Sequence, residues 1–445
     1  MKNIRLAKLW DSLRSSYWFL PGLMVLGGMA LAFGALALDH TSQLEAEELN
    51  WIYRGGADGA RALLSTIAGS MVTVAATAFS ITIVALQLAA SNFGPRLLRN
   101  FMQDTGNQVV LGTFISTFLY CLLVLPTVRG EDYNQFIPQF SVTIGIGLAI
   151  ASTGVLIYFI HHASTIIQAS HVIADVADDL DRAIERLFPK EIGHGKLQSQ
   201  QLVGEIPQDF DSNVCFVRAK NTGYLQVIDD QALLKTACKH DLLLRLQARP
   251  GKFVSEGNIL VQVYPEKRVN QQLINKIHST FLLGNERTEQ QDVSFPIDQL
   301  VEIAVRALSP GINDPFTAIR CIDRLGTTLS FLAEREFPSP YRFDHENNLR
   351  IIAKPVEFDQ LVDVAFTQIR HYGKADVRVI IRLLEAIEQI ASCAHRPHDR
   401  FVLEQQAEMI LQDHYEAASQ EKDRERVAEK YNQVISAIKQ VRTYS

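Results

Sequence analysis

STIAGSMVTVAATAFSITIVALQLAAS, from Ser65 to Ser91, is the stretch that decides the fold. It contains no charged residue and is longer than the roughly 20 apolar residues that a helix needs to cross a bilayer. Because backbone amides in lipid must be hydrogen-bonded within their own segment, the stretch is predicted to be a helix rather than a strand. Its many hydroxyl groups distinguish it from an ordinary apolar anchor.

Three further uncharged stretches have the length of a membrane span. The four predicted spans are Tyr17 to Leu38, Ala62 to Ala90, Asn107 to Val128, and about Phe136 to Ile160. The first follows a basic tail and so resembles a secretion signal, but its apolar core is too long and more spans follow, which indicates a retained anchor. The predicted fold class is therefore an α-helical membrane protein with four transmembrane helices.

Basic residues in the short flanks predict the orientation of the spans. The N-terminal tail and the second loop carry Lys2, Arg5, Lys8, Arg14, Arg96 and Arg99, against Arg54, Arg61 and Arg129 in the first and third loops. This modest bias places the N-terminus in the cytoplasm. With an even number of spans, everything after His162 is predicted to be cytoplasmic too.

The rest of the chain is predicted to be a cytoplasmic α+β region. We divide the sequence into a tail (1–16), a four-helix transmembrane domain (17–162), a helical extension and linker (163–212), a small β domain (213–266) and a mainly helical domain (267–445). The fourth span is expected to continue as one helix into the extension, because no Gly or Pro interrupts it. The charged segment Asp423 to Val441 is expected to dock on the body or on a neighbouring subunit.

Period-two patterning between Val214 and Tyr264 predicts strands at 214–219, 223–228, 242–248 and 259–264, with a short helix around Leu234. A hairpin is expected at YRFDHENNLRIIA (341–353). The stretch Arg249 to Arg268 resembles a half-motif of biotinyl and lipoyl carrier domains, with Lys267 at the position of the modified lysine. Pro265-Glu266 departs from the carrier pattern and no second half follows, so the resemblance implies a structural, barrel-sandwich-like unit.

Polar residues in the opening stretch fall on one helix face. Thr66, Ser70, Thr73, Thr77 and Ser80 recur at steps of four and three, and Gln87 and Ser91 continue the frame. Two interpretations remain open. Small hydroxyl residues permit close helix packing, or the row lines a watered path in which hydroxyl dipoles replace part of an ion's hydration shell. Because four helices enclose little space, a path for an ion or small solute requires a homo-oligomer.

Other candidate residues lie outside this row. Arg96 and Arg99 follow the second span, where they are expected to contact lipid head groups or simply anchor the helix. Asp175, Asp178 and Asp179 form an acidic cluster that either enriches cations near an inner channel mouth or is a solvated helix face. Asn313 and Asp314 precede Pro315, so Asp314 is predicted to cap a helix, with an anion or interface site as the alternative.

Composition limits the functions to be considered. Five scattered cysteines suggest neither a disulfide framework nor a zinc site. A net charge of −6, without basic runs interleaved with aromatics, argues against nucleic acid as a partner. No phosphate-binding loop, dinucleotide fingerprint, zinc-protease motif or nucleophile elbow is present, so we predict no catalytic residue, no metal and no cofactor.

SNFGPRLLRNF (Ser91 to Phe101), GTFISTFLYCLLVLPTVR (Gly112 to Arg129) and RALSPGINDPFTA (Arg306 to Ala318) together resemble a family of predicted bacterial inner-membrane proteins catalogued as a domain of unknown function. The resemblance covers almost the whole chain. It implies a multi-pass protein of the bacterial inner membrane but assigns no functional residue. The leading hypothesis is an oligomeric channel or transport-like protein, and the alternative is a non-conducting scaffold or sensor.

Overall fold

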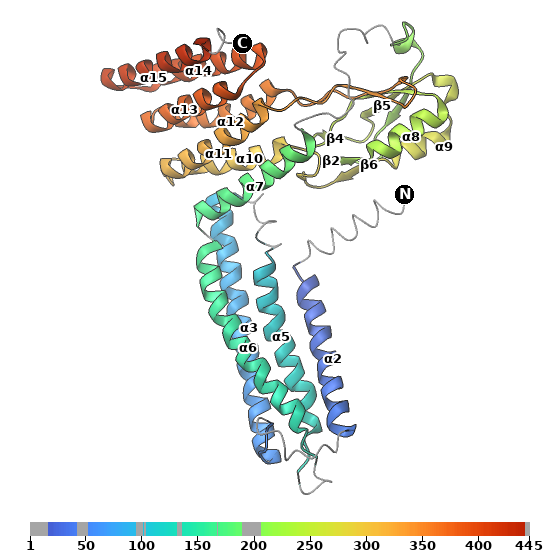
Figure 1. Cartoon of the computed structure of the whole chain (residues 1–445), viewed down its shortest axis with the longest axis vertical. Helices are drawn as coiled ribbons and strands as arrows, with labels where there is room; N and C mark the ends of the chain where they lie inside the picture. The colour runs from blue at the N-terminus through green and yellow to red at the C-terminus, as the bar shows by residue number, and fades with distance from the viewer. Residues whose placement is uncertain are drawn as a thin grey trace. The chain divides into compact units, whose positions relative to one another are not determined.

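A computed structural model describes residues 17–41, 52–94, 101, 104–130, 136–166, 168–188 and 206–440. The chain divides into two compact units, residues 1–171 and 172–445 (Figure 1). The first is all helical and the second mixes helices with strands. We call them the membrane unit and the C-terminal unit and describe each by itself.

The described residues of the membrane unit form four long apolar helices. They are α2 (Phe19–Thr41), α3 (Ala57–Phe93), α5 (Thr105–Val124), which continues into the 3-10 turn Leu125–Thr127, and α6 (Gln139–Ile166). Each is long and apolar enough to cross a membrane. The four spans predicted from the sequence are therefore confirmed as helices of spanning length, with α3 extending beyond its predicted bounds at both ends.

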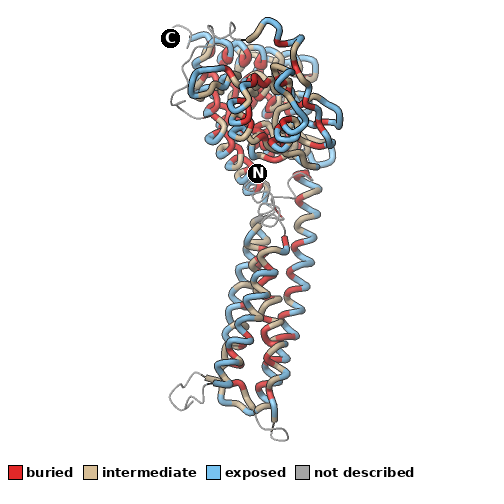
Figure 2. The backbone as a smooth tube through the Cα atoms, turned by 90° about the vertical axis from the view of Figure 1, so that its right-hand side faces the viewer, coloured by how far each residue is buried: buried red, intermediate tan, exposed pale blue. Residues whose placement is uncertain are grey.

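Small residues and buried polar pairs hold the membrane unit together. Gly28 of α2 lies directly against Ser116 of α5, and Gly112 of α5 lies against Met24 of α2. The buried Tyr120 hydroxyl donates to the Ser141 carbonyl at 2.8 Å, which ties α5 to the start of α6. Along these helices, short buried segments alternate with exposed ones, as Figure 2 shows.

The expectation that the fourth span runs on as one helix is wrong. Helix α6 ends at Ile166, and α7 (Ala169–Leu187) begins after Gln168. The Thr165 hydroxyl donates to the carbonyls of His161 and His162, and the Gln168 amide bonds to the Thr165 carbonyl only three residues back. This three-residue hydrogen bond tightens the last turn of α6, and such a turn is common where an α-helix ends without Gly or Pro.

The C-terminal unit contains two sheets. The five-stranded sheet has the order β1-β5-β3-β8-β7 and the three-stranded sheet the order β4-β2-β6. The strands are β1 (Cys215–Arg218), β2 (Gly223–Ile228), β3 (Leu243–Leu246), β4 (Phe253–Val254), β5 (Ile259–Tyr264), β6 (Phe281–Gly284), β7 (Tyr341–Phe343) and β8 (Leu349–Ile352). All four predicted strands and the predicted hairpin are confirmed, with shorter bounds for β1 and β3.

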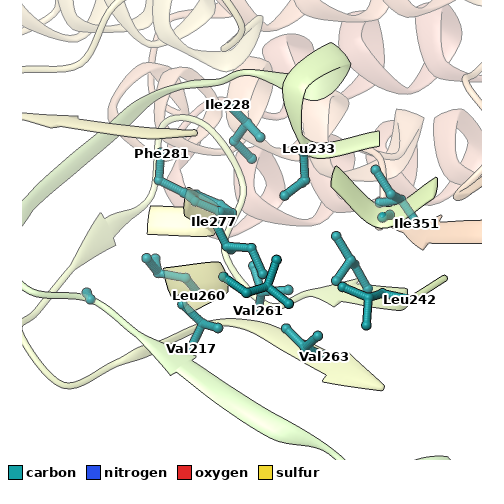
Figure 3. Close-up of a cluster of buried hydrophobic side chains, with 14 of the residues drawn as sticks. Val217, Ile228, Leu233, Leu242, Leu260, Val261, Val263, Ile277, Phe281 and Ile351 are labelled. Atoms are coloured by element: carbon teal, nitrogen blue, oxygen red, sulfur yellow. The ribbon is translucent and has the colours of Figure 1, made fainter. Parts of the chain in front are cut away.

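The hairpin β7–β8 joins the helical part of the C-terminal unit to its strands. Strand β8 pairs parallel with β3, with Ile351 opposite Leu244. Ile351 belongs to the apolar core that also contains Val217, Leu242 and Val261 (Figure 3). Helices α8 (Asp230–His240) and α9 (Gln271–His278) complete this core. Residues more than a hundred positions apart in the sequence, such as Leu242 and Ile351, thus share one apolar core.

Six helices form the remainder of the C-terminal unit. They are α10 (Ser294–Ala307), α11 (Pro315–Ala333), α12 (Phe358–Gly373), α13 (Val377–Cys393), α14 (Pro397–Ala417) and α15 (Glu421–Gln440). The predicted docking of the last segment on the body is confirmed, because Val427, Val434 and Ile438 of α15 are buried and Lys430 pairs with Glu388 of α13 at 2.7 Å.

Candidate functional site

Helix α3 has one buried face, and it is built from small residues. Ala60, Leu64, Ala68, Met71, Ala75, Ala78, Thr82 and Ala89 are all buried. Alanine at most of these positions lets α3 approach its neighbours closely, and Leu64 and Met71 fill the wider gaps between them. Residues on this face contribute to both apolar clusters of the membrane unit.

The predicted hydroxyl row lies on the opposite face. Thr66, Ser70, Thr73, Thr77, Ser80 and Gln87 are all exposed in the single chain. At 3.6 residues per turn, the row is centred roughly half a turn from the buried alanine face. No described residue of the subunit buries the row, so it takes no part in the helix packing seen among these residues.

Each hydroxyl in the row donates a hydrogen bond to its own helix. The Thr66 hydroxyl donates to the Ala62 carbonyl at 2.7 Å, and the Thr77 hydroxyl donates to the Thr73 carbonyl at 2.9 Å. Ser70, Thr73 and Ser80 bond in the same way to carbonyls three or four residues earlier. A hydroxyl whose proton is used in this way still offers oxygen lone pairs as acceptors. The face consequently presents a line of uncharged acceptors.

The acidic candidates lie in the C-terminal unit. Asp175 and Asp178 are on the exposed side of α7, whereas Val176 and Leu180 on its other side are buried. Asp179 is paired with Arg182 at 2.5 Å. Among the described residues, no group of His, Cys, Asp and Glu side chains has the arrangement of a metal site. The role of these aspartates at a channel mouth stays a prediction, and Arg96 and Arg99 lie outside the described residues.

Asp314 caps α11, as the sequence predicts. Its carboxylate accepts from the Thr317 amide at 3.2 Å and from the Thr317 hydroxyl at 2.6 Å, with Pro315 in the first turn. The preceding Asn313 adopts a positive φ of 51°, which turns the chain into the cap. The carboxylate therefore occupies the helix end itself, and an external anion site there stays a prediction.

We expect Asp314→Ala to lower the free energy of unfolding by about 1 kcal/mol, because the Thr317 amide loses its cap. Asp314→Asn keeps a capping oxygen, so its free energy of unfolding should fall much less. The Thr317 hydroxyl and nearby amides outweigh burial and hold the pKa of Asp314 below its usual value. The advantage of the carboxylate is therefore present above about pH 4 and disappears as the pH falls through the lowered pKa. Hydrogen exchange of α11 against pH measures both effects, and equal losses in the two variants would contradict the capping role.

Two polar contacts of the membrane unit were not predicted from the sequence. Asp39, at the end of α2, accepts from the amides of Phe140 and Ser141 at 2.9 Å and thereby caps α6. Asp104 caps α5, and its carboxylate also forms a hydrogen bond with His162 Nε2 at 2.8 Å. An aspartate directly beside a span was the available signal, but its partner on another helix could not be inferred from spacing.

Comparison with known proteins gives the family of this chain. A family described as "Predicted membrane protein (DUF2254)" matches residues 14–389. The chain belongs to this family. It is also similar to two relatives named only as uncharacterized proteins, Rv1290c of Mycobacterium tuberculosis and Mb1321c of Mycobacterium bovis. Each is 31% identical over 435 residues, which are 95% of this chain and 81% of the relative. No solved structure matches the chain.

Proposed function

We propose that the protein is an oligomeric channel or transport-like protein of the bacterial inner membrane, in which α3 lines the conduction path. In this proposal both termini and the whole C-terminal unit are cytoplasmic, and the C-terminal unit assembles or gates the complex. The observation that carries the proposal is the exposed hydroxyl row on the face of α3 opposite its alanine-rich packing face.

The exposure of the row supports a path between subunits. If α3 faced only lipid, the free lone pairs of the hydroxyl oxygens and the Gln87 amide would be aligned towards acyl chains that offer them no hydrogen-bond donor. The core of the membrane unit is filled by Tyr120, Phe114 and Leu64, which are fully buried. A continuous polar route therefore fits best at the centre of a ring of copies that all present α3 inwards.

The chemistry of the row favours cations over anions. The hydroxyl protons point back to carbonyls of α3, so the outward oxygens present lone pairs, which coordinate cations in the way that carbonyl oxygens do in a filter. No fixed charge in the row Thr66 to Gln87 would trap a passing ion. The exposed Asp175 and Asp178, which follow the last span in the sequence, would raise the local cation concentration.

We expect the purified protein in liposomes to pass K⁺ in preference to Cl⁻. Replacing both Thr73 and Thr77 by Leu removes two acceptors and narrows the path, so the K⁺ flux should fall at least tenfold while the oligomer still forms. Flux is measured with a K⁺-sensitive dye inside the vesicles, and assembly by the mass of the purified complex.

A matched control adds bulk elsewhere on the same helix. Val72 and Ile83 are exposed on the flank of α3, between the hydroxyl row and the buried face. Val72→Leu with Ile83→Phe adds bulk at both positions and should leave the flux unchanged. Normal flux in the Thr73→Leu/Thr77→Leu protein would remove the row from the conduction path.

The alternative proposal is a membrane scaffold or sensor that does not conduct. The same row would then form dry contacts between copies, as small hydroxyl residues do in membrane helix pairs. This proposal predicts no K⁺ flux in liposomes that contain the wild-type protein. It also predicts loss of the oligomer in the Thr73→Leu/Thr77→Leu variant. Flux and oligomer mass measured on the same samples separate the two proposals.

A further inference from the structure

A wide cleft lies between the two sheets of the C-terminal unit and the chain that leads from β8 into α12. Its volume is about 1230 Å³. Sites for small molecules usually have volumes of about 300–1000 Å³, so this cleft has room for a ligand of ordinary cofactor size together with water. Six separate stretches of the chain line it, at Ile206, Arg218 and Ile228 and within residues 245–254, 257–259 and 352–360.

The cleft is strongly cationic, although the whole chain is acidic. Five lining residues are Lys or Arg, and Glu357 is the lining carboxylate. The chain as a whole has a net charge of −6. Cations gathered in a concave, partly apolar site raise the local concentration of anions and attract them from solution.

Most of these cations keep their charge uncompensated. Arg249 donates to the Gln360 side-chain oxygen at 2.8 Å, and Arg218 donates to the Gly257 carbonyl at 2.9 Å. Both acceptors are neutral, so they fix the guanidinium groups without neutralising them. Among the described residues, the ammonium groups of Lys252 and Lys354 have neither an ion pair nor a hydrogen bond.

The fifth cation differs from these four. Arg245 is paired with Asp211 at 2.7 Å and lies over the Phe210 ring, 4.1 Å from its centroid. Its charge is already neutralised by Asp211. The free positive charge of the cleft therefore comes from Arg218, Arg249, Lys252 and Lys354, and a ligand that matches it must carry several negative charges.

The loop that carries Arg249 and Lys252 is held rigidly. Gly251 between them has a φ of +83°, and a Cβ at this position would lie 2.1 Å from a carboxylate oxygen of Asp292. Asp292 is itself buried and paired with Arg287. The loop thus lies close against a buried ion pair, and the two cations are positioned before any ligand arrives, which lowers the entropic cost of binding.

An aromatic ring and apolar side chains complete the lining. Phe253 is 57% exposed, and Tyr224 contacts its ring edge to face at 5.1 Å between centroids. Leu246, Ile259 and Ile352 supply half-buried apolar surface in the same cleft. Exposed aromatic rings beside cations are the arrangement that stacks a base and pairs its phosphates.

We propose that this cleft binds a nucleotide, with Arg218, Arg249, Lys252 and Lys354 on its phosphates and Phe253 against its base. Inorganic phosphate alone would leave the aromatic and apolar lining unused, and an apolar ligand would leave four cations unpaired. The proposal is independent of conduction, because it concerns only the C-terminal unit and is tested by binding.

The test uses the full-length protein in detergent and ATP carrying a fluorescent N-methylanthraniloyl group. Unlabelled ATP and GTP should displace this probe, tripolyphosphate should displace it more weakly, and adenosine should fail to do so. Raising KCl from about 50 to 200 mM should weaken binding, since the attraction is electrostatic.

Charge removal in the cleft gives the first specific readout. Lys252→Gln with Lys354→Gln removes no side-chain hydrogen bond or ion pair within the described part of the chain, and it should raise the dissociation constant for ATP at least tenfold. The matched control, Lys239→Gln with Lys276→Gln, removes two exposed charges from α8 and α9 outside the cleft and should change it less than twofold.

The second readout separates the base from the phosphates. Phe253→Leu should weaken the binding of ATP about fivefold or more, because the stacking of the ring on the base is lost. Displacement of the probe by tripolyphosphate should stay unchanged. Failure of the probe to bind, or equal effects of the cleft and control charge variants, would overturn the proposal. Displacement by short-chain phosphatidylglycerol but not by ATP or GTP would also overturn it, and would assign the cleft to lipid head groups.

Discussion

Replacing Arg287 by Ala should lower the free energy of unfolding of the C-terminal unit by about 3–5 kcal/mol. Arg287 Nη2 lies 2.6 Å from an Asp292 oxygen, and Arg287 also bonds to Asp298. The Asp292 side chain is only 4% exposed. Removing the guanidinium therefore leaves a buried carboxylate without its counter-charge, which costs far more than the ion pair itself contributes.

Hydrogen exchange in the full-length protein measures this loss. Amides of β6 and α10, on either side of Arg287, should exchange on the order of a few hundred-fold faster or more, at about tenfold per 1.4 kcal/mol. Burial raises the pKa of Asp292, and loss of Arg287 should raise it further. A raised carboxylate pKa destabilises the fold as the pH rises, so the variant should be less impaired in acid.

An exposed ion pair supplies the matched control. Arg182 pairs with Asp179 on the surface of α7, and its side chain is 67% exposed. Arg182→Ala should cost less than about 1 kcal/mol, because water replaces the partner. A similar loss in the two variants would show that Asp292 is not held as a buried charge. Replacing Arg287 by Met together with Asp292 by Asn should recover part of the stability, because no charge at Asp292 is then left buried and unpaired.

The features that could be predicted from the sequence are those that repeat over a short distance. The four spans need only uninterrupted apolar length, and the strands around Leu225 and Val261 show period-two patterning within a few residues. The hydroxyl row from Thr66 to Gln87 was visible for the same reason. The cap at Asp314 depends on residues within three positions of one another.

Features that depend on distant pairings could not be predicted. The parallel contact of β3 with β8 joins Leu244 to Ile351, and nothing local to either strand indicates the other. The cationic cleft likewise collects Arg218, Lys252 and Lys354 from separate elements, and the net negative charge of the chain conceals it. The direction of the hydroxyl row also depends on which face of α3 meets its neighbours, and hydropathy carries no information about this.

The closeness of α2 and α5 makes Gly28 a position where an added side chain meets the backbone of α5. A Cβ at Gly28 would lie 3.0 Å from the Ser116 Cβ and 3.1 Å from the Ser116 carbonyl oxygen. A Cβ at the adjacent Gly27 would lie in open space. Because lipid provides no hydrophobic force between helices, close packing of small residues is what holds such a pair together.

We therefore expect Gly28→Leu to destabilise the membrane unit by about 1–3 kcal/mol, since the new side chain must push α2 away from the α5 backbone. Gly27→Leu adds the same side chain one residue earlier and should be nearly neutral. Thermal unfolding of both variants in one detergent gives the comparison, and the flux assay gives a second. The hydroxyl row lies on α3, so Gly28→Leu should reduce flux only in proportion to unfolded protein. A Gly27→Leu protein as unstable as Gly28→Leu would mean that another copy, rather than α5, covers this side of α2.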